Sequence, residues 1–328
     1  MSGIANLLQL VEKEVLEYSS SIQQSPKELY DPIKYILSLG GKRIRPLLVL
    51  VACDLYGGEL KSAVPVAIGI ELFHNFSLIH DDIMDNAPLR RGKSTVHEKW
   101  GKNSAILSGD VTLVKAYECL LKTPIEPAVK EKLLTLFCKV AIEVCEGQQL
   151  DINFETTLNV SVPQYIRMIE YKTAVLLAAS LQMGAIVGGV DQNESLKIYK
   201  AGINMGIAFQ LQDDILDVYG DDKFGKQIGG DIIANKKTWL LLKALELSKT
   251  NHYKYEELVQ WQQTTNYSKQ KVEAVTAIYD FLNVRELAQK EMNMYFEKGI
   301  ALLNTLDEDK KRIEEFIEFI RGLMNRTI

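Results

Sequence analysis

The sequence predicts an all-α protein, and three observations support this prediction. Apolar residues recur at the three- and four-residue spacing of amphipathic helices along most of the 328 residues. No segment shows the strict alternation of apolar and polar residues that is typical of half-buried strands. Glycine and proline, with 21 and 8 residues, are scarcer than in an average protein. We therefore expect a large helical bundle.

Helical spacing is clearest in three segments, which lie before a glycine pair, in the middle of the chain and near its end. Their apolar positions are Ile33, Ile36 and Leu37; Leu133, Leu134, Phe137, Val140, Ala141 and Val144; and Ile313, Phe316, Ile317, Phe319 and Ile320.

Helix breakers divide the rest of the chain at residues 40–41, 57–58, 88–92, 124–127 and 221–230. The apolar segments between them predict ten or more helices with short connections. No linker or shift in composition divides the chain, so residues 1–328 are expected to form a single domain. Residues 253–270 are the most polar interior stretch and predict a peripheral helix and loop.

Composition and charge exclude several classes of protein. The net charge of −5 argues against nucleic-acid binding, which relies on a basic face. The four cysteines show no CxxC pair, so reduced thiols are expected, with neither a zinc site nor a disulfide framework.

The uncharged stretch 173–190 is long enough to approach a membrane span, but Ser180, Gln182 and three glycines favour a buried core helix. The first 20 residues resemble an amphipathic helix and not a signal peptide. We expect a cytoplasmic protein without a transmembrane segment.

Two acidic clusters share the pattern DDIxD and lie 132 residues apart, in FHNFSLIHDDIMD (73–85) and MGIAFQLQDDILD (205–217). Residues four apart share a helix face, so Asp81 projects with Asp85 and Asp213 projects with Asp217. Like charges placed in this way repel each other, which favours a bound cation. Carboxylates without His or Cys suit Mg²⁺ held jointly with substrate phosphates. The alternative is an acidic helix face that only contacts solvent. This alternative would account for a single cluster, but two such clusters within apolar helices favour a metal site.

Basic residues accompany both a glycine pair and the first acidic cluster. The segment GGKRIRP (40–46) places cations at the expected start of a helix, where backbone N–H groups also favour an anion. Arg90 and Arg91 directly follow the first cluster. Each alone is typical of a surface charge, but together with the carboxylates they indicate a diphosphate held by metal and by cations.

Taken in order, GGKRIRP, LIHDDIMD with RRG, GQQLD, YKT, FQLQDDILD and GKQIGGD resemble the trans-isoprenyl diphosphate synthases, the polyprenyl synthetase family. The resemblance spans about residues 37–245. It implies an all-α isoprenoid synthase fold around a deep central cavity, a homodimer, and Mg²⁺, in a group of three ions that bridge to the diphosphate.

The resemblance also implies roles for individual residues. Metal ligands would be Asp81, Asp82, Asp85, Asp213 and Asp217. Isopentenyl diphosphate would be bound by Lys42, Arg45, His74 and Arg91. The allylic substrate would be bound by Arg90, Lys172, Thr173, Gln210, Lys226 and Lys236, and the catalytic set would comprise Lys172, Thr173, Gln210, Gln148 and Asp151.

The implied reaction is a head-to-tail condensation of isopentenyl diphosphate with dimethylallyl, geranyl or farnesyl diphosphate through an allylic carbocation. Phe76, five residues before Asp81, would lie about 7.5 Å deeper along the helix, and its ring would form the floor of the cavity. Ser77 beside it is small, so the floor has one aromatic ring, and the first motif DDIMD carries no two-residue insertion. Within the family this combination resembles the type that makes a geranylgeranyl (C20) product.

A farnesyl (C15) product is the close alternative, and longer chains, a terpene cyclase or a regulatory subunit are less favoured. A cyclase would have an Asn/Ser/Glu metal triad in place of the second DDxxD, and a regulatory subunit would have lost aspartates.

Overall fold

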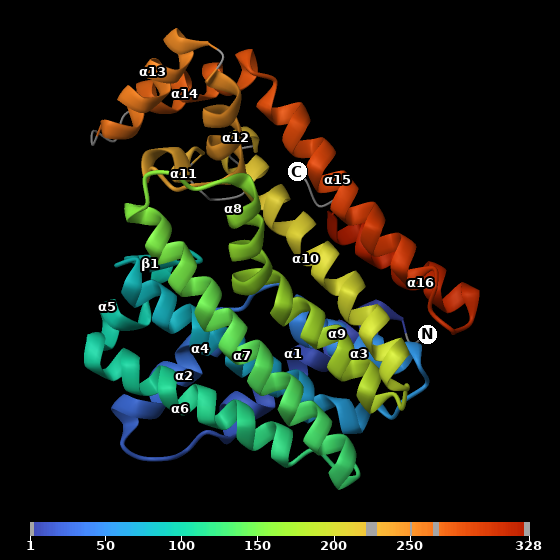
Figure 1. The fold of residues 1–328 in the computed structure, drawn as a ribbon. Coiled ribbons are helices and arrows are strands. Elements are labelled where there is room, and N and C mark those ends of the chain that lie inside the picture. Colours follow the sequence, from blue (N-terminus) through green and yellow to red (C-terminus); the bar gives the residue numbers. More distant parts are fainter. Residues whose placement is uncertain (1–2, 221–227, 250, 265–268, 325–328) are drawn as a thin grey trace. The chain divides into compact units, whose positions relative to one another are not determined.

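The computed structural model describes residues 3–220, 228–249, 251–264 and 269–324, and these residues confirm the all-α prediction (Figure 1). Strands in the described part are confined to one two-residue pair. The elements are α1 (Ile4–Ser21), α2 (Lys27–Ser38), α3 (Ile44–Leu55), α4 (Leu60–Met84), β1 (Leu89–Arg90), β2 (Lys93–Ser94), α5 (Val96–Trp100), α6 (Lys102–Leu121), α7 (Pro127–Thr156), α8 (Val162–Ile169), a π-helix η1 (Glu170–Ala174), α9 (Val175–Val187), α10 (Gln192–Tyr219), α11 (Gly230–Ile233), α12 (Trp239–Ser248), α13 (His252–Gln263), α14 (Lys269–Phe281), α15 (Val284–Leu303) and α16 (Lys310–Met324).

The helices form two compact units, each built from three separate stretches of chain. Unit 1 comprises residues 1–139, 179–199 and 306–316, and unit 2 comprises residues 140–178, 200–305 and 317–328. Neither unit corresponds to one continuous part of the sequence, which agrees with the absence of a linker. The single domain and the central cavity remain predictions.

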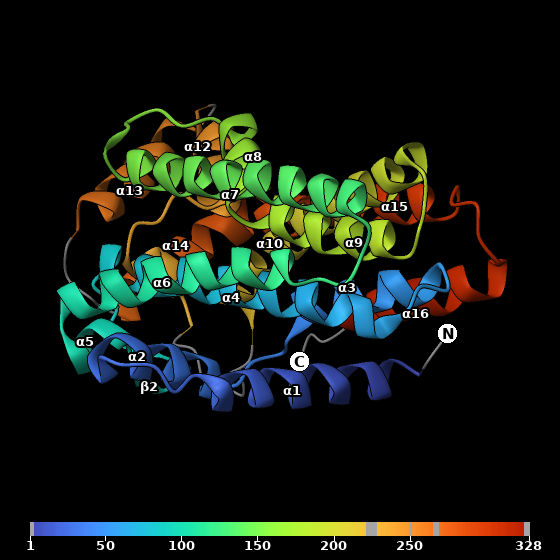
Figure 2. The same ribbon diagram turned by 90° about the horizontal axis from the view of Figure 1, so that it is seen from below.

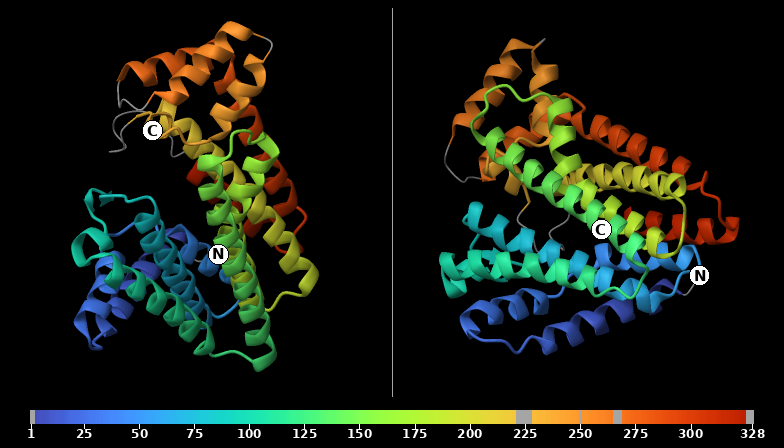
Figure 3. Two further views of the ribbon diagram at one scale, coloured as in Figure 1. Left: turned by 60° about the vertical axis from the view of Figure 1, so that its left-hand side comes forward. Right: turned by 60° about the horizontal axis from the view of Figure 1, so that its bottom comes forward.

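In unit 1, helix α4 packs against α3 and α6 to form the inner layer. Helix α3 is buried along almost its whole length, from Pro46 to Cys53 and at Leu55. Helices α1 and α2 cover this layer from one side, as Figure 2 and the right-hand view of Figure 3 show. The layered packing holds the C-terminal turn of α4, which carries the first acidic cluster, on a rigid base.

Helix α4 is the one helix among the described residues that is long and apolar enough to cross a membrane. Of its most apolar window, 72% is buried inside the protein, as is usual for a core helix. The uncharged stretch 173–190 contributes helix α9, whose residues are likewise largely buried, as expected.

In unit 2, the core gathers around helix α12, which packs against α8, α13, α14 and α15 (Figure 3, left). Trp239, Leu240 and Leu242 on α12 meet Ile278 and Tyr279 on α14 in one buried cluster. The same cluster includes Leu211 and Ile215 of α10, so the helix that carries the second acidic cluster is anchored in this core.

The three segments with clear helical spacing form α2, part of α7 and α16, and most of their apolar positions are buried. The breakers at 40–41 and 57–58 lie between helices as predicted, and the one at 124–127 ends at Pro127, the first residue of α7. The turn at 88–92 is more ordered than expected, because β1 and β2 pair antiparallel with Leu89 opposite Ser94 and Arg90 opposite Lys93.

Candidate active site

The first acidic cluster ends helix α4 in unit 1. Asp85 is exposed and Asp81 is partly exposed, whereas Asp82 is buried with 1% of its surface exposed. The two outer carboxylates therefore reach solvent from one helix face, as the four-residue spacing predicts.

Arg90, at the end of strand β1, neutralises the buried carboxylate. Its Nε lies 3.0 and 2.8 Å from the two oxygens of Asp82, and its Nη2 lies 2.7 Å from one of them. Nη2 is also 3.7 Å from Asp81. Burial opposes the charge, but the hydrogen bonds and charges of Asp82, Asp81 and Asp85 raise the pKa of Arg90 overall. Asp82 is thus engaged by the chain itself, and a metal-ligand role for it remains a prediction.

The GGKRIRP segment leads into helix α3 and places its cations differently. Arg43 is buried, forms an ion pair with Glu71 and donates to the carbonyl of Leu37. Asn75 donates to the same carboxylate at 2.9 Å, so Arg43 belongs to the interior of the unit. Lys42 is exposed at the helix start.

Arg45 contacts His74, with its Nη1 3.4 Å from the ring Nε2. Arginine can only donate, so Nε2 must be the unprotonated nitrogen of a neutral ring. Burial and the charges of Arg45, Arg91, Arg90 and Arg43 hold the pKa of His74 well below its usual value. The structure therefore brings together three of the four residues assigned to isopentenyl diphosphate, Arg45, His74 and Arg91, in a region of positive potential that suits an anion.

Phe76 lies within a group of aromatic rings in unit 1. Its ring centroid is 5.5 Å from Phe73 and 4.8 Å from His80, and Phe73 is 5.2 Å from Phe137. Tyr117 of α6 packs edge-on against Phe137 at 4.8 Å. Ser77, the small neighbour of Phe76, donates its hydroxyl to the carbonyl of His74 at 2.8 Å. Phe76 is therefore backed by further rings from α4, α6 and α7, which the sequence did not predict.

The second acidic cluster lies near the end of helix α10 in unit 2. Asp213 is exposed and Asp217 is partly buried. Asp217 accepts the backbone N–H of Asp231 at 3.0 Å through its side chain and that of Gly229 through its carbonyl. The GGD end of the GKQIGGD motif thus closes the turn around Asp217.

Asp214, which the sequence analysis did not assign, is the buried member of this cluster, with 3% exposure. It accepts hydrogen bonds from the Tyr165 hydroxyl at 2.5 Å, the backbone N–H of Trp239 at 3.2 Å and Nε2 of Gln210 at 3.2 Å. Burial raises the pKa of its carboxyl to about 7, although the hydrogen bond from Tyr165 works in the opposite direction.

The residues assigned to catalysis meet around the π-helix η1. Lys172 pairs with Asp151 of α7 at 2.5 Å, and the Thr173 hydroxyl donates to Oε1 of Gln210 at 3.2 Å. These contacts join η1, α7 and α10, as the assignment requires. Gln148 is half-buried on α7, three residues before Asp151.

Two glycines allow η1 to approach its neighbours. A Cβ at Gly147 of α7 would lie 2.2 Å from the backbone nitrogen of Lys172, and one at Gly206 of α10 would lie 2.5 Å from Cα of Ala174. Both helices therefore press their backbones against the π-helix, where any larger residue would displace it. Short π-helical segments within α-helices are frequent at functional sites.

Lys226 and Lys236 are the two other basic residues assigned to the allylic substrate. Lys236 is exposed after α11, and its N–H donates to the carbonyl of Asp231 at 2.9 Å. Lys226 lies outside the described residues.

The donor set fits Mg²⁺ bound together with a substrate. Among the described residues, no group of three or more His, Cys, Asp or Glu side chains is arranged to hold a metal by itself. Mg²⁺ is usually held by one or two carboxylates, with waters and substrate phosphates completing its octahedron. Oxygen-only pairs such as Asp81 with Asp85 match that requirement, so the metal and the diphosphate are expected to bind jointly.

Comparison with known proteins identifies the family of this chain. Residues 26–279 match the polyprenyl synthetase family, and the chain belongs to this family of prenyltransferases. A geranylgeranyl diphosphate synthase of Methanosarcina mazei is 42% identical over 222 residues, which cover 67% of this chain and 68% of the relative.

Solved structures extend the similarity over the whole chain. A geranylgeranyl pyrophosphate synthase is 41% identical, with a TM-score of 0.94 and 100% of both chains covered. A geranylgeranyl pyrophosphate synthetase from Pyrococcus horikoshii is 32% identical, with a TM-score of 0.90 and 98% of both chains covered. The isoprenoid synthase fold expected from the motifs is confirmed.

The lowered pKa of His74 predicts a specific dependence of stability on pH. The folded protein keeps His74 neutral below pH ~6.5, where the unfolded chain binds a proton, so acid favours unfolding through this residue. The free energy of unfolding, measured by denaturant titration at pH 7 and pH 5, should fall less in His74→Gln than in the parent. Parallel curves for His74→Gln and the parent would contradict the assignment.

Proposed function

We propose that the chain condenses isopentenyl diphosphate with an allylic diphosphate, head to tail and in the trans configuration, and releases geranylgeranyl diphosphate. One observation carries this proposal: paired carboxylates at the end of α4 adjoin a cluster of arginines around a neutral histidine within the same unit. Carboxylates that suit Mg²⁺ beside cations that suit phosphate are what a metal-bound diphosphate requires. The similar proteins named as geranylgeranyl synthases support the product.

The isopentenyl diphosphate would lie at the N-terminus of α3. Lys42, Arg45, His74 and Arg91 supply its direct contacts, and the helix N-terminus adds backbone N–H groups and a favourable dipole. Neutral His74 donates a hydrogen bond from its protonated ring nitrogen without adding a further charge. Arg43 remains bound to Glu71 and supports the loop from inside.

The allylic diphosphate would be held through Asp81, Asp85, Asp213 and Asp217, with Arg90, Lys226 and Lys236 as additional cations. Mg²⁺, when bound to these carboxylates and the diphosphate, neutralises the charge that develops on the leaving group. The C–O bond then breaks, and the alkene of isopentenyl diphosphate attacks the allylic cation. A proton passes from the new cation to the departed diphosphate, so no protein base is needed.

Lys172, Thr173 and Gln210 would border the reacting carbon. Thr173 and Gln210 contribute oxygen atoms, while the pairing of Lys172 with Asp151 fixes the position of the lysine in the middle of η1. Gln148 extends this polar border on α7. Apolar helix faces around the growing chain would exclude water, which would otherwise capture the cation.

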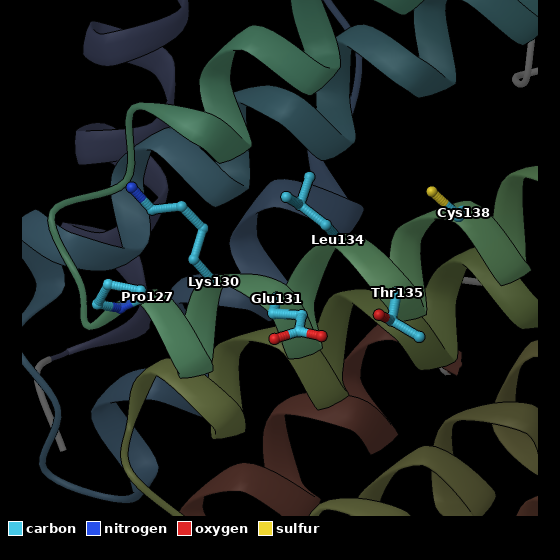
Figure 4. Close-up of a pocket in the computed structure, with 6 residues that line it drawn as sticks. All are labelled: Pro127, Lys130, Glu131, Leu134, Thr135 and Cys138. Atoms are coloured by element: carbon cyan, nitrogen blue, oxygen red, sulfur yellow. The ribbon is translucent and has the colours of Figure 1, made fainter.

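A homodimer is the proposed assembly, as the family resemblance implies. Leu107, Val114 and Leu121 of α6 are 57%, 65% and 54% exposed and lie seven residues apart, so they share one helix face. A hollow of about 530 Å³ lies on the neighbouring part of α7 and is drawn in Figure 4 with its lining residues. Lys130 from this hollow donates to the carbonyl of Leu121 at 2.7 Å, so hollow and stripe adjoin. An exposed apolar stripe of this kind is typical of a protein interface, and light scattering on the purified chain measures the assembly.

The cytoplasm is the proposed location.

The reaction is tested by mass spectrometry of the products formed from isopentenyl diphosphate, Mg²⁺ and each of dimethylallyl, geranyl and farnesyl diphosphate. A dominant C20 product from all three primers is expected. Products that stop at C15, with farnesyl diphosphate refused, would make the enzyme a farnesyl synthase. Absence of condensation with every primer would overturn the proposal in favour of a regulatory subunit or a cyclase.

Replacing the first carboxylate tests the metal site. Asp81→Ala should lower turnover by about 100-fold or more, because a ligand that stabilises charge in the transition state is lost. The helical circular dichroism should stay unchanged, since Asp82 still anchors Arg90. The exposed Glu17 on α1 offers a control, and Glu17→Ala should keep parental turnover. Near-normal turnover in Asp81→Ala would refute the assignment.

Replacing the predicted floor tests chain-length control. Phe76→Ala removes a ring that packs against Phe73 and His80, and the vacated space should admit one or more further isoprene units. The product distribution from farnesyl diphosphate, measured by mass spectrometry, should shift from C20 to C25 or longer. Phe281→Ala, at a ring 59% exposed on α14, should leave the distribution unchanged. An unaltered product from Phe76→Ala would place the floor elsewhere.

A further inference from the structure

A chain of hydrogen bonds in unit 2 connects a buried carboxylate to the two side chains proposed to face the allylic cation. Trp239 N–H and the Tyr165 hydroxyl donate to Oδ2 of Asp214, at 3.2 and 2.5 Å. Nε2 of Gln210 donates to Oδ1 of Asp214 at 3.2 Å, and Oε1 of Gln210 accepts from the Thr173 hydroxyl at 3.2 Å. The chain thus runs from α12 and α8, through α10, to η1.

The direction of every bond in this chain follows from its buried end. A backbone N–H and an amide NH₂ group can only donate, so Oδ2 and Oδ1 of Asp214 both act as acceptors, from Trp239 and from Gln210. Asp214 therefore turns the NH₂ group of Gln210 toward itself, and the amide oxygen must point to Thr173. Thr173 donates its hydroxyl proton to that oxygen, so its own lone pairs face away from Gln210.

Burial protects the hydrogen bond between Asp214 and Gln210 from exchange with water. Asp214 is 3% exposed, so water cannot replace Gln210 as its partner, whereas Gln210 and Thr173 are only partly buried. Asp214 itself has no access to a substrate at the open side and can act only through Gln210. Asp214, which the substrate does not touch, thus determines which atoms of Gln210 and Thr173 are donors and which are acceptors.

We propose that Asp214 is a positioning residue that fixes the amide orientation of Gln210, so that Gln210 and Thr173 present oxygen atoms, and no N–H group, to the allylic carbocation. This inference rests on the proposed function, since it assumes that a cation forms beside these two side chains. Oxygen lone pairs stabilise a developing positive charge, and an amide NH₂ in the same place would repel it. Tyr165 and Trp239 serve to hold the carboxylate in place.

Asp214→Asn tests the proposal because it keeps the size of the side chain and reverses the polarity. The two donors at Oδ2, Tyr165 and Trp239, require the asparagine oxygen at that position. The asparagine NH₂ then faces Gln210, whose amide must rotate and turn its own NH₂ toward Thr173. We expect kcat to fall about 100-fold, with KM for the allylic diphosphate unchanged, because the lost interaction exists only in the transition state.

The paired variant Asp214→Asn with Gln210→Glu restores the original polarity. The introduced glutamate can accept from the asparagine NH₂ and from Thr173 at once, and the net charge equals that of the parent. This variant should recover most of the turnover that Asp214→Asn loses. Failure of the second substitution to recover any turnover would overturn the proposal.

Tyr165→Phe separates positioning from stability. It removes one donor at Oδ2 but leaves Trp239 N–H, so Gln210 keeps its orientation. Its melting temperature should fall while kcat stays near the parental value, whereas Asp214→Asn should show the reverse. If kcat follows the melting temperature in both variants, Asp214 is only structural. If excess Mg²⁺ restores Asp214→Asn, its charge acts through the metal and the proposal fails.

A measurement on the substrate-free protein keeps this test independent of catalysis. With ¹⁵N-labelled glutamine, the side-chain amide of Gln210 is recognised by its disappearance in Gln210→Glu. Its proton resonance should move upfield in Asp214→Asn, since the carboxylate acceptor is lost, and an unmoved resonance would refute the orientation. Absence of prenyl transfer by the parent protein would instead refute the proposed function alone.

Discussion

Adjacent carboxylates repel each other, and the two aspartate-rich helices meet this constraint in the same way. In each cluster the second aspartate turns inward and is bound by donors of the chain itself. Asp82 is held by Arg90, and Asp214 by Tyr165, Trp239 and Gln210. The carboxylates at the first and fifth positions of each DDIxD motif remain on the outer face of the helix, where a cation can reach them. The position of Arg90 and the orientation of Gln210 both depend on these buried anchors.

The cations of unit 1 are divided in a corresponding way. Arg43 is neutralised by Glu71 inside the unit, so the loop before α3 is fixed without using the charges that face outward. Arg45 and Arg91 keep their charge near His74, whose ring is neutral as a result. A buried ion pair is a weak source of stability, but it fixes the geometry of its surroundings when its hydrogen bonds are satisfied. In this protein Asn75 donates a further hydrogen bond to the carboxylate of Glu71.

The sequence predicted the fold class, several of the breaks between helices and the aspartates that share a helix face. Helical periodicity and breakers are local signals, and the spacing of Asp81 and Asp85 on one face follows from helix geometry alone. Asp214 was missed because the same argument pairs only Asp213 with Asp217 and gives no role to the residue between them, which lies about 100° around the helix from Asp213. Tyr165 lies 49 residues from Asp214, and no spacing rule connects them. The aromatic rings behind Phe76 come from three helices, so only tertiary packing reveals them.

The π-helix at Glu170–Ala174 constrains how this chain can vary during evolution. One residue of an α-helix corresponds to a rotation of about 100°, so the additional residue in the wide turn sets the phase between the side chains of α8 and those of α9. A deletion within these five residues would keep the helix continuous but turn Lys172 and Thr173 away from Asp151 and Gln210. Gly147 and Gly206 fit the wider turn and would lose their close contacts with it. Insertions and deletions should therefore be absent from this segment in lineages that retain activity, even where the neighbouring loops vary in length.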